Sequence, residues 1–185
     1  LIEHGHIIHS LRSEFFESFS PVVAKYYEQI ADYREDVSVR YTSQLNDNTL
    51  AQLLKSNRSK EVIVQRCLYG IHKDDMELLM TDRPVKAYAS QGQRKSLLLA
   101  LKIAQFDFIR AKLKVSPLIL LDDLFDKLDQ HRVRKLIEVL TAGDFGQIFI
   151  TDTSRTRVAD AIAKVDIKTD WLTIKDGAVI KIEHQ

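Results

Sequence analysis

The sequence predicts an α/β fold with a parallel sheet, preceded by a mainly helical segment. A short, wholly apolar run at 118–121 and a second apolar run at 147–151 have the composition of buried parallel strands. One helix pattern precedes the first run, another separates the two runs and a third follows them. This alternation of strands and helices is typical of a parallel sheet. We assign residues 1–66 to the helical segment and residues 67–185 to the α/β part.

Composition limits the classes of protein that fit. The chain of 185 residues suits one domain, or one domain and part of a second, and its 45% hydrophobic content suffices for a core. A net charge of +1 does not favour a strongly basic nucleic-acid-binding arm. The single cysteine, Cys67, excludes an internal disulfide framework and favours a reducing, cytoplasmic location.

Nothing in the sequence suggests a membrane protein. No apolar run approaches the roughly 18 residues of a membrane span, so we expect no membrane partner. The N-terminus lacks the basic and apolar segments of a signal peptide. Because the sequence opens at Leu1 without a methionine, we expect it to be a piece of a longer protein.

The helical segment begins with a stripe of large apolar side chains, which predicts an amphipathic helix at 10–34. Pro21 lies inside this stripe, so we expect a kink or a new helix start there, with Ser20 as the cap. Alternating apolar and polar residues at 37–41 indicate a short strand. A second helix is predicted at 49–67.

The α/β part begins with a predicted hairpin whose arms, 76–80 and 85–89, flank the turn signal Thr81-Asp82-Arg83-Pro84. Next comes a helix at 92–114 that is apolar nearly all round, so we expect it to be buried.

Two further helices, at 130–141 and 155–165, accompany the two apolar strands. The last predicted element is a second hairpin at 171–182, which turns at Asp176-Gly177.

The start of the helix at 92–114 carries the first chemical motif, Ser90-Gln91-Gly92-Gln93. Free N–H groups at a helix start bind phosphate, and Ser90, Gly92 and their neighbours supply them here. By itself the motif also suits an ordinary N-cap. Lys95-Ser96 is not a P-loop, because the G-x-x-x-x-G-K-[ST] spacing is absent, and no other part of this chain supplies that motif.

The second motif is the pair Asp122-Asp123, which follows the apolar run 118–121. Carboxylates at the carboxyl end of a buried strand lie where α/β folds bind ligands. We expect Asp122 to reach Mg²⁺ and Asp123 to orient or deprotonate a water molecule. The alternative for this motif alone is a solvated acidic turn. Asp129 is predicted to cap the next helix.

The order of these motifs is more specific than either one. A Ser-x-Gly-Gln helix start, then an apolar strand ending in Asp-Asp, then Leu128-Asp129 resembles the second half of an ATP-binding-cassette (ABC) ATPase head, a P-loop NTPase-like fold. Four segments further resemble the C-terminal half of the bacterial RecF family: 70–75, 89–95, 97–104 and 120–123.

The first of these segments, Gly-x-His-x-Asp-Asp, separates RecF from transporters and other ABC ATPases. Ile71 and Lys73 depart from the family's proline and arginine. So does the stretch 125–128, where the family has Ser-Glu-Leu.

The resemblance implies a recombination mediator that acts in DNA repair, recombination, replication restart and the SOS response. Its implied cofactors are ATP and Mg²⁺. Its implied partners are gapped DNA with a single-strand/double-strand junction, a second copy in an ATP-dependent dimer, and a RecR-type mediator protein. Slow ATP hydrolysis is expected only of the full-length protein.

Roles for individual residues also follow from the resemblance. Ser90, Gln91, Gly92 and Gln93 would act in trans on nucleotide held by the partner's P-loop. Three other roles are implied: Asp122 as the Walker B magnesium residue, Asp123 as the catalytic carboxylate, and Asp129 in the D-loop. Thr151 is also a cofactor-binding candidate, since Thr151-Asp152-Thr153 stands where transporters have a switch histidine.

Two alternative classes were weighed. A structural-maintenance-of-chromosomes (SMC) type head would need a long heptad coiled coil, and residues 10–34 are too short and too aromatic for one. A transporter nucleotide-binding subunit is disfavoured by the missing switch histidine.

Two groups of polar residues stay open to more than one interpretation. His72 beside Asp74 and Asp75 suits a metal site or a polar turn. Several basic residues suit either phosphate contacts or solvated helix faces: Arg132, Arg134, Lys135, Arg155 and Arg157.

Overall fold

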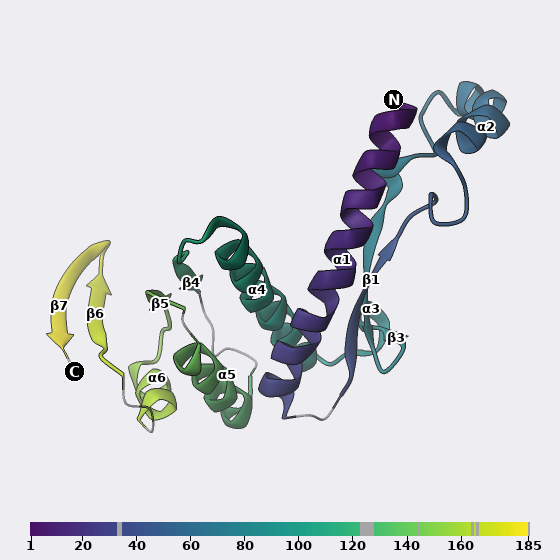
Figure 1. The fold of residues 1–185 in the computed structure, drawn as a ribbon. Coiled ribbons are helices and arrows are strands. Elements are labelled where there is room, and N and C mark those ends of the chain that lie inside the picture. Colours follow the sequence, from purple (N-terminus) through teal and green to yellow (C-terminus); the bar gives the residue numbers. More distant parts are fainter. Residues whose placement is uncertain (33–34, 123–127, 144, 164, 166, 185) are drawn as a thin grey trace.

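The computed structural model describes residues 1–184 except 33–34, 123–127, 144, 164 and 166 (Figure 1). The elements in chain order are α1 (Ile2–Ala31), β1 (Val37–Thr42), α2 (Leu50–Val64), the 3₁₀ turn η1 (Ile71–Lys73), β2 (Asp75–Met80), β3 (Arg83–Pro84), α3 (Val85–Tyr88), α4 (Gln91–Leu113), β4 (Ile119–Leu121), α5 (Gln130–Ala142), β5 (Ile148–Ile150), α6 (Arg155–Ile162), β6 (Asp170–Lys175) and β7 (Ala178–His184).

The first helix is longer than its apolar stripe predicts. Helix α1 begins at Ile2 and runs without interruption through Pro21. The expected new start with Ser20 as its cap is therefore wrong. Instead, Ser20 Oγ accepts a hydrogen bond from the Val39 N–H at 2.9 Å, which ties α1 to β1. Packing along its length supports the helix at the proline, where one backbone hydrogen bond is lost.

The predicted first hairpin is only half correct. β2 pairs antiparallel with β1, with Val37 opposite Met80 and Thr42 opposite Asp75. The second arm is wrong, because β3 contains only two residues and the chain then forms helix α3. Pro84 has no N–H to donate to the ladder, so pairing ends there.

Helix α4 packs against α1, and the two form the centre of one core (Figure 1). It begins within one residue of its predicted start. The expectation that its apolar side chains are buried holds for Leu97 and Ile103 but is wrong for Leu98, which is 56% exposed.

The core crosses the boundary that the sequence suggests at residue 66. Buried side chains from both sides of it belong to a single cluster, among them Tyr27 and Ile30 of α1 and Leu97 and Leu136 from the α/β part. The division into 1–66 and 67–185 stays a prediction.

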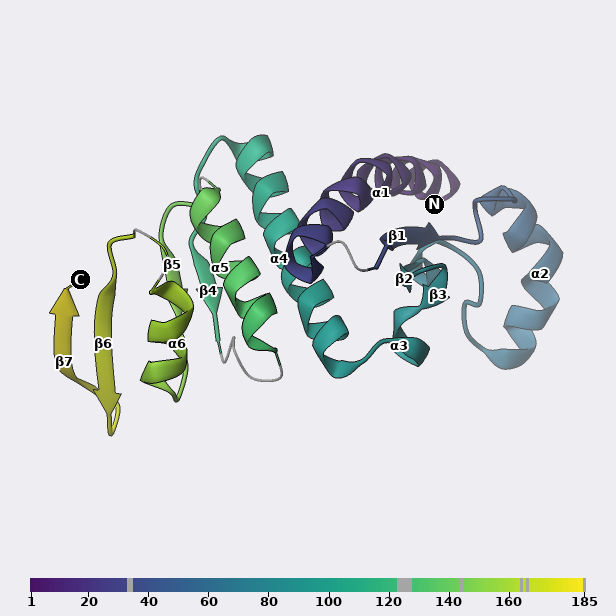
Figure 2. The ribbon, with the colours of Figure 1, turned by 90° about the horizontal axis from the view of Figure 1, so that it is seen from below.

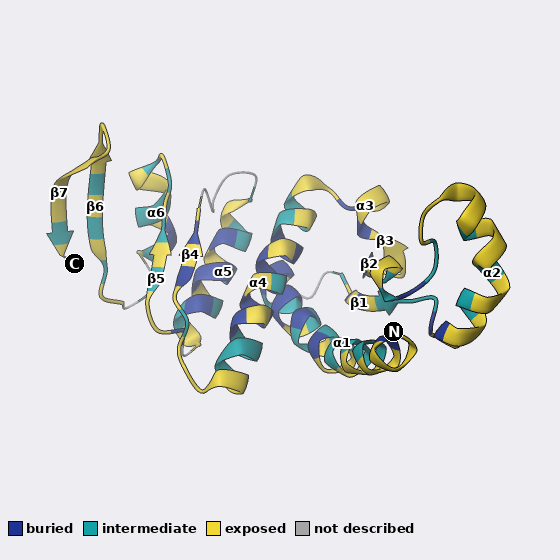
Figure 3. Ribbon diagram, turned by 90° about the horizontal axis from the view of Figure 1, so that it is seen from above, coloured by how far each residue is buried: buried dark blue, intermediate teal, exposed yellow. Residues whose placement is uncertain are grey.

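The two apolar runs form the predicted parallel pair. β4 and β5 pair with Ile119 opposite Ile148 and Leu121 opposite Ile150. Helices α5 and α6 lie next to one another beside this pair (Figure 2). Ile119 and Leu121 join the core, whereas Leu120 between them is 73% exposed (Figure 3).

The last predicted hairpin is confirmed. β6 and β7 pair antiparallel and turn at Asp176-Gly177, both with positive φ. Among the helices that the structure describes, none is both long and apolar enough to cross a membrane.

Candidate functional site

The helix start at Ser90 is a complete capping box. Ser90 Oγ accepts a hydrogen bond from the Gln93 N–H at 3.2 Å, and Gln93 Oε1 accepts one from the Ser90 N–H at 2.7 Å. Ser90 is therefore the N-cap of α4, as predicted. Ser90 and Gln91 are exposed, while Gly92 is half-buried. The capping box uses the N–H groups of Ser90 and Gln93, so among the described contacts those of Gln91 and Gly92 are left for a ligand from outside the chain.

The carboxyl ends of β4 and β5 bring two predicted site residues together. Asp122 follows β4 and Thr151 follows β5, at the same edge because the strands are parallel. The Thr151 hydroxyl donates a short hydrogen bond to Asp122 Oδ1, and the Thr151 N–H donates one to the Leu121 carbonyl at 2.9 Å. Both side chains belong to exposed residues. Asp123 lies outside the described residues, so its predicted role is not tested.

Asp129 caps helix α5, as the sequence predicts. Its Oδ1 accepts a hydrogen bond from the Arg132 N–H at 2.9 Å. This hydrogen bond outweighs partial burial and holds the pKa of Asp129 below its usual range, and the Arg132 charge acts in the same direction. Of the unusual stretch 125–128, only Leu128 is described.

A chain of polar contacts joins the starts of α4 and α5. Gln93 Nε2 donates to Glu35 Oε1 at 2.8 Å, and Arg132 Nη2 lies 3.9 Å from the same oxygen. On its other side, Arg132 Nε lies 3.7 Å from Asp129 Oδ2. The Tyr27 hydroxyl donates to Glu35 Oε2 at 3.0 Å. Gln93 and Asp129 are thus linked through Glu35 and Arg132.

Sequence reasoning missed Glu35. It lies in a run of charged residues between α1 and β1, and no local pattern distinguishes it from its neighbours. Arg132 was expected to contact phosphate or to lie on a solvated face. Its side chain is only 12% exposed and pairs with two carboxylates of the same chain.

The predicted site residues therefore form two groups. One group joins the start of α4 to Asp129, and the other joins Asp122 to Thr151. In the parts of the chain that the structure describes, no hydrogen bond or ion pair is found between the two groups.

The Gly-x-His-x-Asp-Asp segment forms a structural anchor around Asp74. The Asp74 side chain is 3% exposed and accepts hydrogen bonds from Arg12 Nη1 at 2.7 Å, Ser43 Oγ at 2.6 Å and the Tyr41 hydroxyl. Burial alone would raise the pKa of Asp74, but these three donors outweigh it and the pKa is lowered. The cluster joins α1, β1 and the segment before β2.

The neighbouring His72 contacts the Cys67 carbonyl, with Nε2 and oxygen 3.3 Å apart. Across the described residues, no group of three or more His, Cys, Asp or Glu side chains could hold a metal ion. This favours the polar turn over the metal site at His72.

Three of the other basic residues are paired with acidic side chains. Lys135 pairs with Glu138, Arg155 with Glu183 and Arg157 with Asp152. The pairs of Lys135 and Arg155 fit solvated helix faces rather than free phosphate ligands, whereas Arg157 pairs with Asp152, whose side chain is 0% exposed.

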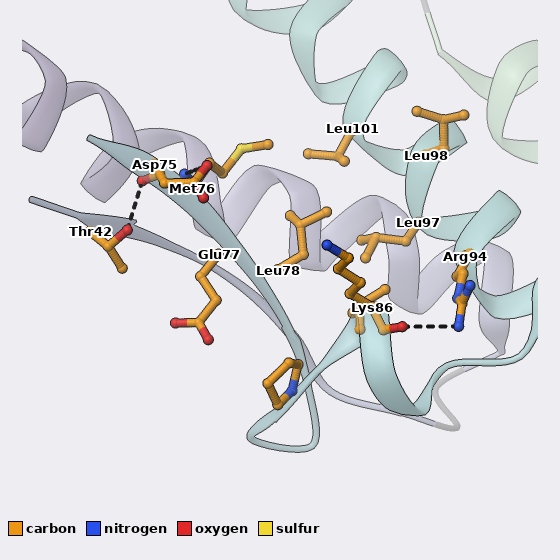
Figure 4. Close-up of a pocket in the computed structure, with 12 residues that line it drawn as sticks. Thr42, Asp75, Met76, Glu77, Leu78, Lys86, Arg94, Leu97, Leu98 and Leu101 are labelled. Atoms are coloured by element: carbon orange, nitrogen blue, oxygen red, sulfur yellow. Dashed lines mark hydrogen bonds between the residues drawn. The ribbon is translucent and has the colours of Figure 1, made fainter. Parts of the chain in front are cut away.

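One described cavity is lined by none of the predicted site residues. It has a volume of about 560 Å³ and is lined by β2, α3 and α4, including Leu78, Leu97, Leu98 and Leu101 (Figure 4). Lys86 and Arg94 lie at one side of it, where the Lys86 carbonyl accepts a hydrogen bond from Arg94 at 3.1 Å. Its lining is mainly apolar and does not suit a nucleotide phosphate.

Comparison with known proteins identifies relatives along the whole chain. The chain is 37% identical over 185 residues to a "DNA replication and repair protein RecF" of Bacteroides fragilis, covering 100% of this chain and 50% of that protein. It is 41% identical over 179 residues to the RecF of Bacteroides thetaiotaomicron, covering 97% of this chain and 48% of that protein. The chain corresponds to the C-terminal half of RecF proteins. It spans about half the length of the curated relatives it matches, and no protein-family model matches it.

Solved structures support the fold. A structure of the recombination mediator protein RecF with ATPrS in the RecFOR pathway matches with a TM-score of 0.72 at 23% identity, covering 97% of this chain and 47% of that one. An SMC ATPase structure matches with a TM-score of 0.58 at 15% identity, over 95% of this chain and 88% of that one. The predicted fold class, the C-terminal half of an ABC-type ATPase head, is confirmed.

Proposed function

We propose that this chain supplies half of the ATPase head, and part of a helical arm, of a RecF-type recombination mediator. The main support is the parallel register of β4 and β5, which brings Asp122 and Thr151 together at the carboxyl edge of the sheet in a chain similar to RecF throughout. In α/β folds this edge is where ligands bind.

ATP and Mg²⁺ are the proposed cofactors. Mg²⁺ prefers oxygen ligands and is held by one or two carboxylates together with water and substrate phosphates. Asp122 and Thr151 offer a carboxylate and a hydroxyl in contact, both belonging to exposed residues, and this donor set fits such an ion. Bound Mg²⁺ would neutralise charge on the transferred phosphate.

The other steps of ATP hydrolysis are assigned to side chains of the protein. Asp123 follows Asp122 directly, and we propose that it orients the attacking water or accepts its proton. Asp122 and Thr151 would hold the metal from the same edge. The P-loop that would cradle the phosphates is absent from this chain, so hydrolysis requires the rest of the protein.

Ser90–Gln93 is proposed to meet the nucleotide of a second copy. The capped start of α4 is exposed and its first N–H groups point out of the helix, which suits a phosphate. In this proposal a nucleotide is sandwiched between two protomers, with Ser90–Gln93 of one protomer facing the nucleotide held by the other. Asp129 would lie in the D-loop of the same interface.

The cellular role follows from the relatives' names and is also proposed. The protein would act in the cytoplasm, in DNA repair, recombination and replication restart, on gapped DNA with a single-strand/double-strand junction. A RecR-type mediator would be its protein partner. The similarity of this chain to solved RecF complexes with ATP and ATPrS in the RecFOR pathway supports these assignments.

A pair of substitutions in the full-length protein tests the proposal. We expect Asp123→Asn to lower ATP turnover by roughly 10²- to 10⁴-fold and to prolong the ATP-bound dimer, because amidation removes the base and keeps its shape. Asp122→Asn should weaken all magnesium-dependent steps. The matched control is Asp160→Asn, at an exposed residue on α6. Wild-type turnover in Asp123→Asn would contradict the assignment of the catalytic carboxylate.

A further inference from the structure

Glu35 makes polar contacts with the starts of both α4 and α5, the two helix starts of the proposed dimer interface. Its carboxylate accepts hydrogen bonds from Gln93 Nε2 at 2.8 Å and from the Tyr27 hydroxyl at 3.0 Å. The Glu35 side chain is 20% exposed, and Tyr27 is fully buried. Burial, and then the Glu35 charge, raise the pKa of Tyr27, so this hydroxyl stays a donor.

The charge of Glu35 fixes which way the Gln93 amide points. A carboxylate can only accept hydrogen bonds, so the NH₂ end of Gln93 must face Glu35. The carbonyl end, Oε1, is then turned toward the Ser90 N–H, where it completes the capping box at 2.7 Å. Loss of the charge at position 35 would remove this constraint, and the hydrogen bond from the Ser90 N–H would then be the contact that orients the Gln93 amide.

The same carboxylate is connected to the start of α5. Arg132 Nη2 lies 3.9 Å from Glu35 Oε1, and its Nε lies 3.7 Å from Asp129 Oδ2. Because the Arg132 side chain is 12% exposed, its charge is compensated mainly by these two carboxylates. Because Asp129 and Arg132 both belong to the start of α5, the contact between Arg132 and Glu35 is the one that would break if this helix start moved away from Glu35.

We propose that Glu35 is a positioning residue that holds the Ser90–Gln93 helix start and the Asp129 helix start in one fixed geometry. It acts through Gln93 on one side and through Arg132 on the other. The inference rests on the proposed function, in which both helix starts meet a second copy across the nucleotide. Without Glu35, each helix would still be capped locally, but the two helix starts would no longer be held in a fixed position relative to each other.

The test uses the full-length protein and the isosteric variant Glu35→Gln. We expect the ATP concentration for half-maximal dimerisation to rise about tenfold, the effect of losing one charge-assisted hydrogen bond. ATP binding by the monomer should stay at the wild-type value, because the phosphate cradle lies elsewhere in the protein. The control is Asp36→Asn, which removes the same charge from the next residue, an exposed one.

Hydrogen exchange supplies a second measurement that does not depend on dimerisation. In Glu35→Gln, exchange should accelerate at the starts of both α4 and α5. Arg132→Gln should also accelerate exchange at residues 90–94 of α4. Among the described side-chain contacts, Arg132 is connected to these residues only through Glu35. Unchanged exchange at 90–94 in Arg132→Gln would overturn the coupling.

The outcomes separate this inference from the proposed function. Wild-type dimerisation by Glu35→Gln, or a parallel loss of monomer ATP binding and melting temperature, would overturn the positioning role. Ser90→Arg provides the other arm, since it should block dimerisation if the helix start meets a partner. Normal dimers in Ser90→Arg would refute the proposed function itself.

Discussion

The substitution Asp74→Asn should loosen the junction between α1 and the β1–β2 ladder. Asp74 is 3% exposed and receives hydrogen bonds from three donors, Arg12, Ser43 and Tyr41. Asparagine keeps the shape but replaces one acceptor oxygen with an NH₂ group. If that group faces Arg12 and Tyr41, the hydrogen bond from Arg12 is lost; if it faces Ser43, the Ser43 hydroxyl must accept instead of donate. In both orientations, the hydrogen bonds that remain lose the carboxylate charge.

The expected cost follows from these contacts. A hydrogen bond to a charged group contributes about 1.5–3 kcal/mol, and the substitution removes the charge from all three. Arg12 is 42% exposed and can be rehydrated, which limits the loss. We expect about 3 kcal/mol less local stability, or roughly a 100-fold loss of exchange protection at 1.4 kcal/mol for each factor of ten.

Hydrogen exchange of the full-length protein measures this loss. The informative amides are those of Tyr41 and Thr42, which lie in the ladder opposite Met76 and Asp75. The matched control is Asp75→Asn, a change of the same chemistry at the adjacent, exposed residue. If protection falls by less than about threefold, or equally in both variants, the anchoring role of Asp74 is refuted.

The pH dependence of stability provides a second test of the role of Asp74, because the direction of the change can be predicted. The pKa of Asp74 is lowered in the folded chain, so its contribution is complete above the ordinary aspartate pKa of about 3.9. It is lost as the pH falls through the lowered value. The stability difference between wild type and Asp74→Asn should therefore be constant from about pH 5 to 8 and shrink below about pH 4. A difference that shrinks already near neutral pH would contradict this assignment.

Two further predictions concern the proposed nucleotide site. This chain alone should not hydrolyse ATP because it lacks a P-loop, and magnesium-dependent turnover above that of an Asp123→Asn control would contradict this. In the full-length protein, Ser90→Arg should block ATP-induced dimerisation, measured by light scattering, while nucleotide binding to the monomer persists. An unaltered dimer would mean that Ser90 is only a helix cap.

Several features could be predicted because they depend on neighbouring residues. Ser90 and Asp129 are helix caps, and capping is decided within the first turn of a helix. The edge position of Asp122 and Thr151 follows from two apolar strands and the parallel pairing that an intervening helix favours. The same local rules misjudged 85–89, which was predicted as the second arm of a hairpin but forms helix α3 after the pairing ends at Pro84.

The sequence by itself determined the order of most elements, the helix caps Ser90 and Asp129, and the edge of the sheet at which Asp122 lies. Only the tertiary structure decided that Glu35 meets Gln93, 58 positions away, and that Asp74 meets Arg12, 62 positions away. The packing of whole helices determines these contacts. A side chain extends only a few ångströms from its own backbone, so two distant residues meet only where their helices or strands are packed together. Local periodicity fixes which face of a helix is buried, but it carries no information on which distant polar group that face will meet.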